Sequence, residues 1–209
     1  MKLLLIILII FGSTCFAQPT IKIDTLIDFS KEDSISLQKE LKIVKTILDS
    51  EVFWSKIKAY DFSCTNQRTF HSGRKKKKTL YPKKRRDRHV YTNQEIHDLL
   101  WFGQDEIGEP KDGVIDLKLR SKKYSPNKNG TTTHGSTNKN TLIISSSPKT
   151  RINNSTKGVY ACHLLHEYMH VLGFEHKSND PKKNKKKCGG SDVALGIQLI
   201  AIETLKELR

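Results

Sequence analysis

Apolar residues recur along the first third of the chain with the spacing of a helix. Residues 18–28 alternate only loosely, and Ser30 with the acidic residues after it has the composition of a capped helix start. Apolar side chains then follow every three or four positions, at Leu37, Leu41, Val44, Ile47, Leu48, Phe53, Trp54 and Ile57. This spacing predicts helical structure over 34–60, interrupted near Asp49 and Ser50.

Three later segments also have helical patterns. Thr92, with Glu95 three residues on, forms a capping box, in which the hydroxyl and the carboxylate each satisfy a backbone N–H of the first turn. Apolar residues follow this pair on one side. We therefore predict helices over 93–107, 158–172 and 192–208, the last of them capped by Ser191.

Two short segments have the patterns of strands. Apolar and polar residues alternate through 114–119, which predicts a half-buried strand. The apolar run at 141–145 predicts a second strand, at the edge of a sheet. Between them, 125–140 is rich in Asn, Gly, Thr and Lys and is expected to be a loop.

The length and composition fit one folded domain. The chain has 209 residues, of which 36% are hydrophobic, and this is enough for a modest core. The mixture of helices and strands predicts an α+β fold. We place a single domain at 34–209, after an N-terminal extension at 18–33 that can serve as a short pro-segment.

The segment 1–17 has the layout of a secretory signal peptide. Lys2 precedes an unbroken apolar run from residue 3 to residue 11, and small residues lead to Ala17, so cleavage is expected before Gln18. The run is about half of the roughly 20 apolar residues that span a membrane, so we expect no anchor after cleavage. A lipoprotein with a lipidated Cys15 fits less well, because the expected Leu is missing before it. The sequence therefore predicts a secreted or periplasmic protein.

Removal of this segment leaves three cysteines, Cys64, Cys162 and Cys188. An exported protein can keep a disulfide, but an odd number leaves at least one thiol without a partner in its own chain. The sequence does not choose among the three pairings, and three buried thiols fit equally well.

The candidate chemistry is concentrated in one stretch, His166-Glu167-Tyr168-Met169-His170-Val171-Leu172-Gly173-Phe174-Glu175-His176. On a helix, residues four apart share a face, so His166 and His170 can bind one metal ion. Gly173 stands where the helix must end, because glycine adopts the left-handed capping conformation without steric cost. The chain can then turn back and bring His176 to the same ion. The chance of the full pattern arising from this composition is on the order of 10⁻⁵.

Three neutral imidazoles leave one position open on a zinc ion, as in catalytic rather than structural sites. Glu167 is expected to reach a water molecule on the open side and to act as general base in the hydrolysis of a peptide bond. A downstream carboxylate such as Glu203 is the alternative to His176 as third ligand. Just upstream, Cys162 is expected in the core or in a disulfide, and His163 on the surface.

The pattern His166-Glu167-x-x-His170-x-x-Gly173-x-x-His176 resembles the long zinc-binding signature of the metzincin metalloendopeptidases. The Gly-Phe-Glu-His end of this stretch and the segment 191–197 are similar to those of a group of small secreted bacterial proteins with HExxHxxGFxH. The resemblance implies that the three histidines bind zinc and that Glu167 is the general base. It also implies a metzincin-like core with a small mixed sheet, an active-site helix carrying HExxH and a C-terminal helix.

Two further features of metzincins bear on this chain. Their methionine-containing turn beneath the metal is missing, because no methionine follows Met169. We expect the floor of the site to come from 188–191 and the last helix, with 193–195 packed beneath it. The resemblance also implies an antiparallel edge strand that binds an extended peptide, and 141–145 is the candidate, with an ordinary core strand as the alternative.

The chain is strongly basic, with 37 Lys+Arg against 22 Asp+Glu and a formal net charge of +15. Basic runs occur at 74–78, 83–88 and 182–187, the first two in a basic loop at 72–90 that we expect to be exposed or to form a hairpin with a solvated tip. Such runs can bind an anionic surface, a glycan or nucleic acid, or can form an ordinary lysine-rich surface. Few aromatic residues accompany them, which argues against nucleic acid.

These observations together predict a secreted zinc metalloendopeptidase that acts on a peptide or protein substrate. Two other functions stay open. One is an anionic-polymer binding protein with a non-catalytic zinc site, and the other is a zinc hydrolase of a non-peptide amide.

Overall fold

The structure is a computed structural model that describes residues 18–62, 69–70, 85–86, 89–103, 112–123, 135–138, 141–147, 158–176 and 192–209. The segment 1–17 expected to be a signal peptide, most of the basic loop, Cys64, Cys188 and Ser191 lie outside these residues. The helices are α1 (Lys31–Leu48), α2 (Glu51–Ala59), α3 (Asn93–Trp101), α5 (Val159–Val171) and α6 (Val193–Glu207). The strands are β1 (Thr20–Ile27), β2 (Thr69–Phe70), β3 (Arg85–Arg86), β4 (Val114–Ser121), β5 (Gly135–Asn138) and β6 (Ile143–Ser146).

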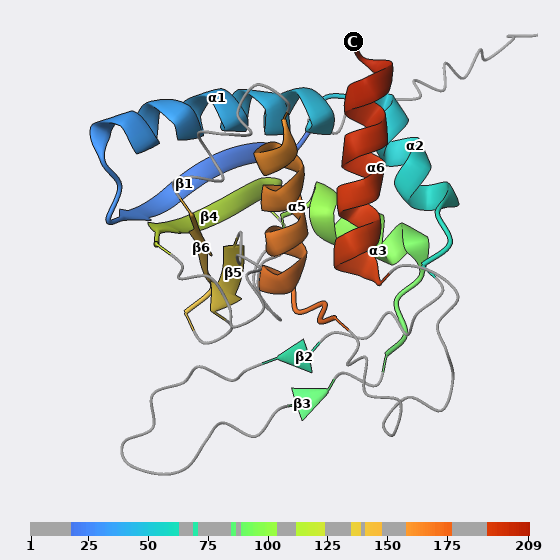
Figure 1. Ribbon diagram of the computed structural model, residues 1–209. Coiled ribbons are helices and arrows are strands. Elements are labelled where there is room, and N and C mark those ends of the chain that lie inside the picture. The colour runs from blue at the N-terminus through green and yellow to red at the C-terminus, as the bar shows by residue number, and fades with distance from the viewer. Residues whose placement is uncertain are drawn as a thin grey trace, which may run out of the picture.

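The main sheet has four strands in the order β1-β4-β6-β5. Strands β1 and β4 run parallel, as do β4 and β6, whereas β5 is antiparallel to β6. The described residues therefore form an α+β fold with a small mixed sheet, as the sequence predicts (Figure 1). Every second residue of β4 is buried, which confirms the alternation at 114–119.

Two expectations about the strands that follow β4 in the sheet are wrong. The strand expected at 141–145 is β6, and it lies between β4 and β5 rather than at an edge. The last strand of the described sheet is β5, which falls inside the segment 125–140 that was expected to be a loop. Its four residues, Gly-Ser-Thr-Asn, have low strand propensity, so pairing with β6 determines their conformation.

Strand β1 belongs to this sheet rather than to a separate extension. Its residues pair in register with β4 from Thr20 opposite Val114 to Ile27 opposite Arg120, with one irregularity between Ile23 and Thr25. The segment 18–33 thus contributes a full strand and the first turn of α1 to the fold.

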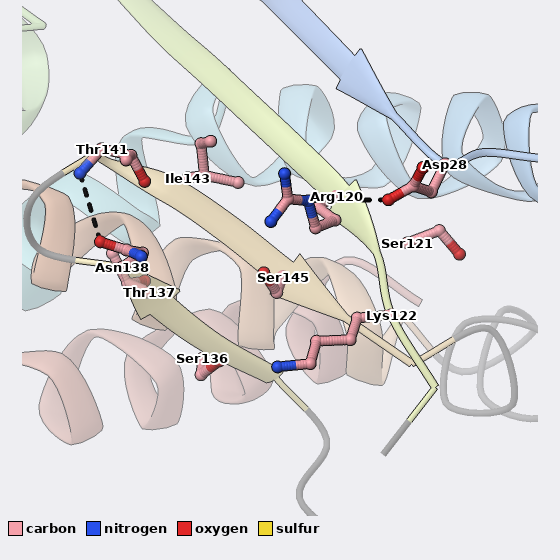
Figure 2. A pocket seen from close by; sticks show the side chains of 10 residues that line it. All are labelled: Asp28, Arg120, Ser121, Lys122, Ser136, Thr137, Asn138, Thr141, Ile143 and Ser145. Atoms are coloured by element: carbon pink, nitrogen blue, oxygen red, sulfur yellow. Dashed lines mark hydrogen bonds and ion pairs between the residues drawn. The ribbon is translucent and has the colours of Figure 1, made fainter.

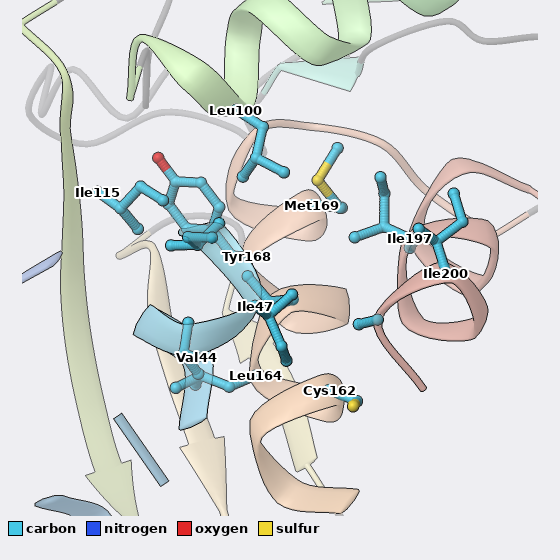
Figure 3. Packing of buried hydrophobic residues seen from close by; sticks show 14 of the residues in the cluster. Val44, Ile47, Leu100, Ile115, Cys162, Leu164, Tyr168, Met169, Ile197 and Ile200 are labelled. Carbon is cyan, nitrogen blue, oxygen red and sulfur yellow. The ribbon is translucent and has the colours of Figure 1, made fainter. Parts of the chain in front are cut away.

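Helix α5 lies at the centre of the molecule. It contacts α1, α6, β5 and β6, so it is enclosed by helices and by the sheet (Figure 1). Tyr168 and Met169 of α5 are buried in the core, where Tyr168 lies beside Ile115 of β4 and Met169 points towards Leu100 of α3 and Ile197 of α6 (Figure 3). The helix that carries the histidines is therefore packed on several sides by the core.

The helix boundaries follow the sequence signals closely at their starts. Ser30 caps α1, and Thr92 forms the expected capping box with Glu95. The helical pattern over 34–60 divides into α1 and α2 at 49–50, as predicted. Helix α6 is capped by Asp192, whose side chain accepts a hydrogen bond from the Leu195 N–H, where Ser191 was expected.

Helix α3 is shorter than the predicted 93–107. It ends at Trp101, because Gly103 turns the chain with a φ of 63°. A Cβ on Gly103 would lie 1.9 Å from the carbonyl oxygen of Val114, so only glycine permits this approach to β4.

The two short strands β2 and β3 pair antiparallel, with Thr69 opposite Arg86 and Phe70 opposite Arg85. Their pairing agrees with a hairpin at the base of the basic loop 72–90. None of the helices in the described part of the chain combines the length and the apolar character needed to span a bilayer.

Candidate metal centre

The end of helix α5 turns the chain sharply at Gly173. Leu172 is the C-cap residue of α5. Gly173 follows it with a φ of 93°, which only glycine adopts without strain. The Gly173 N–H donates to the His170 carbonyl and the Phe174 N–H to the Met169 carbonyl, the two bonds of a Schellman motif. The predicted role of Gly173 is therefore confirmed, and the turn directs 174–176 back towards the helix.

This turn brings the three predicted histidines together. The imidazole nitrogen atoms that His166, His170 and His176 can offer a metal ion all lie within 4.8 Å of one another. The ring centroids of His170 and His176 are 4.5 Å apart, and each is 4.9 Å from that of His166. His166 is buried, His170 is partly buried and His176 is exposed, so the cluster opens towards solvent on one side.

The hydrogen bonds of two rings fix which nitrogen faces the cluster. The Nδ1 atom of His170 donates to the Phe174 carbonyl, and Nδ1 of His176 lies 2.8 Å from Oδ2 of Asp192. A carbonyl and a carboxylate can only accept, so both Nδ1 atoms carry protons. The lone pairs of the neutral rings are then on Nε2, the atom that metal-binding histidines commonly use.

The two Nε2 atoms are 3.1 Å apart and point towards each other. Without a proton or a cation between them, two nitrogen lone pairs at this distance repel. Two nitrogen ligands about 2.0–2.1 Å from one tetrahedral zinc ion lie about 3.3 Å apart, close to the observed spacing. The donor set and its geometry thus fit a single divalent cation.

The third ring has the electrostatic environment of a metal ligand. Burial, together with the neighbouring His170 and His163, lowers the pKa of His166 to about 3. His166 is therefore neutral at physiological pH, the form in which imidazole binds a metal. The structure of the described residues thus supports all three predicted ligands.

Asp192 connects this cluster to helix α6. Its Oδ1 accepts from the Leu195 N–H as the helix cap, while Oδ2 accepts from His176. Burial raises the pKa of Asp192, but the hydrogen bonds from His176 and Leu195 outweigh it and hold the pKa below its usual range. Sequence reasoning missed this residue, because placing Ser191 as the cap left Asp192 with no assigned role.

Glu167 lies beside the histidines with its carboxylate buried. Only 4% of the residue is exposed, and its Oε2 accepts a hydrogen bond of 2.7 Å from the Thr137 hydroxyl of β5. Burial raises the pKa of Glu167 above its usual range, while the Thr137 hydrogen bond and nearby His176 act in the opposite direction. A raised pKa suits a carboxylate that accepts a proton near neutral pH.

His163 is not the surface residue that the sequence suggested. Its side chain is largely buried, stacks on His166 with ring centroids 5.6 Å apart, and places Nε2 3.4 Å from Oε1 of Glu167. It lies four residues before Glu167, so one helical face carries both side chains. Cys162 is buried in the core with a free thiol, which agrees with the expectation of a core residue rather than of a disulfide.

The surroundings of the cluster decide two other expectations. Glu203, the alternative third ligand, forms an ion pair with Lys56 of α2 and does not belong to the histidine cluster. Of the residues 193–195 expected beneath the site, Val193 and Ala194 are buried, whereas Leu195 is 40% exposed and cannot form a floor.

A polar cavity of about 500 Å³ lies over β4, β5 and β6 (Figure 2). Arg120 and Lys122 line it on one side, and Ser136 and Asn138 of β5 on the other. None of the three histidines lines it. Thr137 lines this cavity and also donates a hydrogen bond to Glu167.

Comparisons with protein-family models, curated proteins and solved structures give no match to this chain. A functional proposal therefore depends on the geometry of its own residues.

Proposed function

We propose that this protein is a secreted zinc metallopeptidase with a metzincin-like active site. The observation that supports it most strongly is the convergence of three imidazoles, within 4.8 Å, at the end of a buried helix. The spacing of the same histidines in the sequence, which resembles the metzincin signature, supports the same conclusion. The N-terminal segment 1–17 supports export of the chain.

In this proposal the histidines bind the metal and Glu167 carries out proton transfer. A zinc ion held by these three histidines would supply Lewis acidity, which would polarise a scissile carbonyl and make a nearby water more acidic. Glu167 accepts the proton of the attacking water and delivers it to the leaving amine. Asp192 keeps the Nδ1 proton on His176, so that Nε2 remains available for binding.

The substrate is expected to be a peptide that approaches along β5. This strand is antiparallel to its neighbour, contacts helix α5 and carries the threonine bonded to Glu167. An extended chain beside β5 would lie next to the strand whose Thr137 contacts Glu167. The segment 141–145 cannot take this part, because β4 and β5 flank it.

The proposal is tested with the mature chain, residues 18–209, as wild type and as Glu167→Gln. We expect wild-type protein to contain close to one zinc ion per chain and to cleave mixed peptides in a chelator-sensitive reaction. Glu167→Gln should keep its zinc and lose about 10²- to 10⁴-fold in rate, because only the general base is removed. Zinc content and cleavage are measured on the same samples.

Glu203→Gln is the matched control, since it makes the same chemical change on α6 at a carboxylate that pairs with Lys56. It should keep both zinc and activity. Equal activity in wild type and Glu167→Gln would contradict the proposal. Zinc without peptide cleavage, together with retention on an anionic glycan or release of a non-peptide amide, would favour one of the two other functions.

A further inference from the structure

The carboxylate of Glu167 is contacted by a strand that is distant in sequence. Thr137 of β5 donates to Oε2 at 2.7 Å, and its hydroxyl also lies 3.0 Å from the Glu167 backbone oxygen. A hydroxyl has one proton, and the shorter contact to an ionised acceptor is the stronger bond. The hydroxyl is thus directed at the carboxylate.

Strand β5 approaches helix α5 this closely because it begins with glycine. A Cβ on Gly135 would lie 2.4 Å from Nε2 of His163 and 3.2 Å from the Ser145 carbonyl oxygen. His163 in turn faces Oε1 of Glu167 at 3.4 Å. The two oxygens of Glu167 therefore face two different groups, and the absence of a side chain at residue 135 makes this arrangement possible.

Alternation along β5 separates two faces. Ser136 and Asn138 are exposed, whereas Thr137 is partly buried and faces the helix. The residue that contacts Glu167 is therefore set by the register of β5 on β6, in which Thr137 lies opposite Ile144. A shift by one residue would turn the hydroxyl away from the site.

We propose that Thr137 is a positioning residue that fixes the carboxylate of Glu167 and so couples β5 to the general base. This inference rests on the proposed role of Glu167 in peptide hydrolysis. A general base must hold its acceptor oxygen in a defined direction, and an error of about 1 Å costs up to about 10²-fold in rate. Thr137 supplies this orientation from the strand along which the substrate is expected to bind.

The alternative is that Thr137 only fastens the strand to the helix. The fold contains a matched example of such a contact, because the buried Tyr160 hydroxyl of α5 donates to Oγ of Ser146 in β6 at 2.8 Å. Tyr160 lies at the opposite end of α5 from the histidine turn. Tyr160→Phe therefore removes a helix-to-sheet hydrogen bond without removing one from Glu167.

Four proteins are compared in the zinc-loaded mature chain, namely wild type, Thr137→Val, Thr137→Ser and Tyr160→Phe. Valine keeps the shape of threonine without its hydroxyl, and serine restores the hydroxyl. We measure kcat, KM, zinc content and the thermal unfolding midpoint. Crystal structures of wild type and Thr137→Val show the orientation of the Glu167 carboxylate directly, independently of activity.

We expect Thr137→Val to lower kcat about 10- to 100-fold with KM and zinc content unchanged. Thr137→Ser should restore most of kcat, and Tyr160→Phe should keep the wild-type kcat despite any fall in unfolding midpoint. In the crystal, the Glu167 carboxylate should rotate away from its wild-type position in Thr137→Val.

A kcat for Thr137→Val within twofold of wild type, or an equal loss in Tyr160→Phe, would overturn the proposal. An unrotated carboxylate in the Thr137→Val crystal would overturn it even if no peptide is ever cleaved. Failure of the proposed function is recognised separately, because wild type and Glu167→Gln would then have the same activity.

Discussion

At the scale of single residues, Asp192 has two tasks that a capping residue does not normally combine. One oxygen starts helix α6, and the other fixes the proton position on His176. This second contact connects the residues on either side of the lysine-rich segment 177–191, which lies outside the described residues.

The two tasks of Asp192 are separable by substitution. Asparagine caps helices as well as aspartate does, so Asp192→Asn should leave the unfolding free energy of the metal-free protein within about 0.5 kcal/mol of wild type. It removes the carboxylate that accepts from His176, and we expect zinc affinity to fall about 10- to 100-fold. Zinc affinity is measured by competition with a chelator of known affinity. An unchanged zinc affinity would contradict the role of Asp192 in orienting His176 for zinc binding.

At the scale of elements, the turn after α5 converts a two-histidine motif into a three-histidine cluster. Gly173 adopts a φ of 93°, and the hydrogen bonds of the turn place the Phe174 carbonyl against His170. The same turn therefore orients one ligand and delivers another. The contribution of this turn to the unfolding free energy can be separated experimentally from its contribution to zinc binding.

We predict that Gly173→Ala costs about 1–2 kcal/mol of unfolding free energy and also weakens zinc binding at least tenfold. Gly113→Ala is the control, because Gly113 has a φ of 74° and a Cβ there would meet nothing within 4 Å. It should have a similar cost in stability with no change in zinc affinity. Urea unfolding and zinc titration of both variants test this, and equal zinc affinities would exclude a role for the turn in placing His176.

The sequence could predict the elements whose signals are local. The caps at Ser30 and Thr92, the alternation in β4 and the spacing of the three histidines each depend on a few neighbouring residues. Strand β5 could not be predicted, because Gly135 to Asn138 become extended through pairing with β6. The contacts of Thr137 and His163 with Glu167 depend on that pairing, so they too required the structure.

At the scale of the whole molecule, a buried carboxyl links the first helix to the start of the histidine helix. Glu40 of α1 is fully buried, and its Oε2 accepts from the Ala161 N–H at 2.9 Å. Burial raises the pKa of Glu40 to about 7, although the hydrogen bond from Ala161 opposes this. Burial raises the pKa of the Cys162 thiol to about 12, and the nearby Glu40 carboxylate acts in the same direction.

This placement makes stability depend on pH. Because the folded pKa of about 7 lies above the ordinary 4.5, the folded state holds the proton more tightly. The stabilisation by protonated Glu40 is complete below pH 4.5 and is lost as pH rises to about 7, which corresponds to about 3 kcal/mol.

Glu40→Gln should remove this dependence, since glutamine stays neutral and its oxygen can still accept from Ala161. Relative to this variant, wild type should lose about 3 kcal/mol of unfolding free energy between pH 4.5 and pH 8. Urea unfolding across this range is the measurement, with the exposed Glu51→Gln as the control for loss of one charge. A difference between wild type and Glu40→Gln that does not vary with pH would contradict the prediction.

The central claim is that three imidazoles hold one divalent cation with a position left for water. X-ray absorption spectroscopy of the zinc-loaded mature protein measures this ligand set directly. The account predicts three imidazole nitrogens and one oxygen at about 2.0–2.1 Å from zinc, with one imidazole lost in His176→Ala. A sulfur ligand, a fourth imidazole, or an unchanged spectrum in His176→Ala would contradict it.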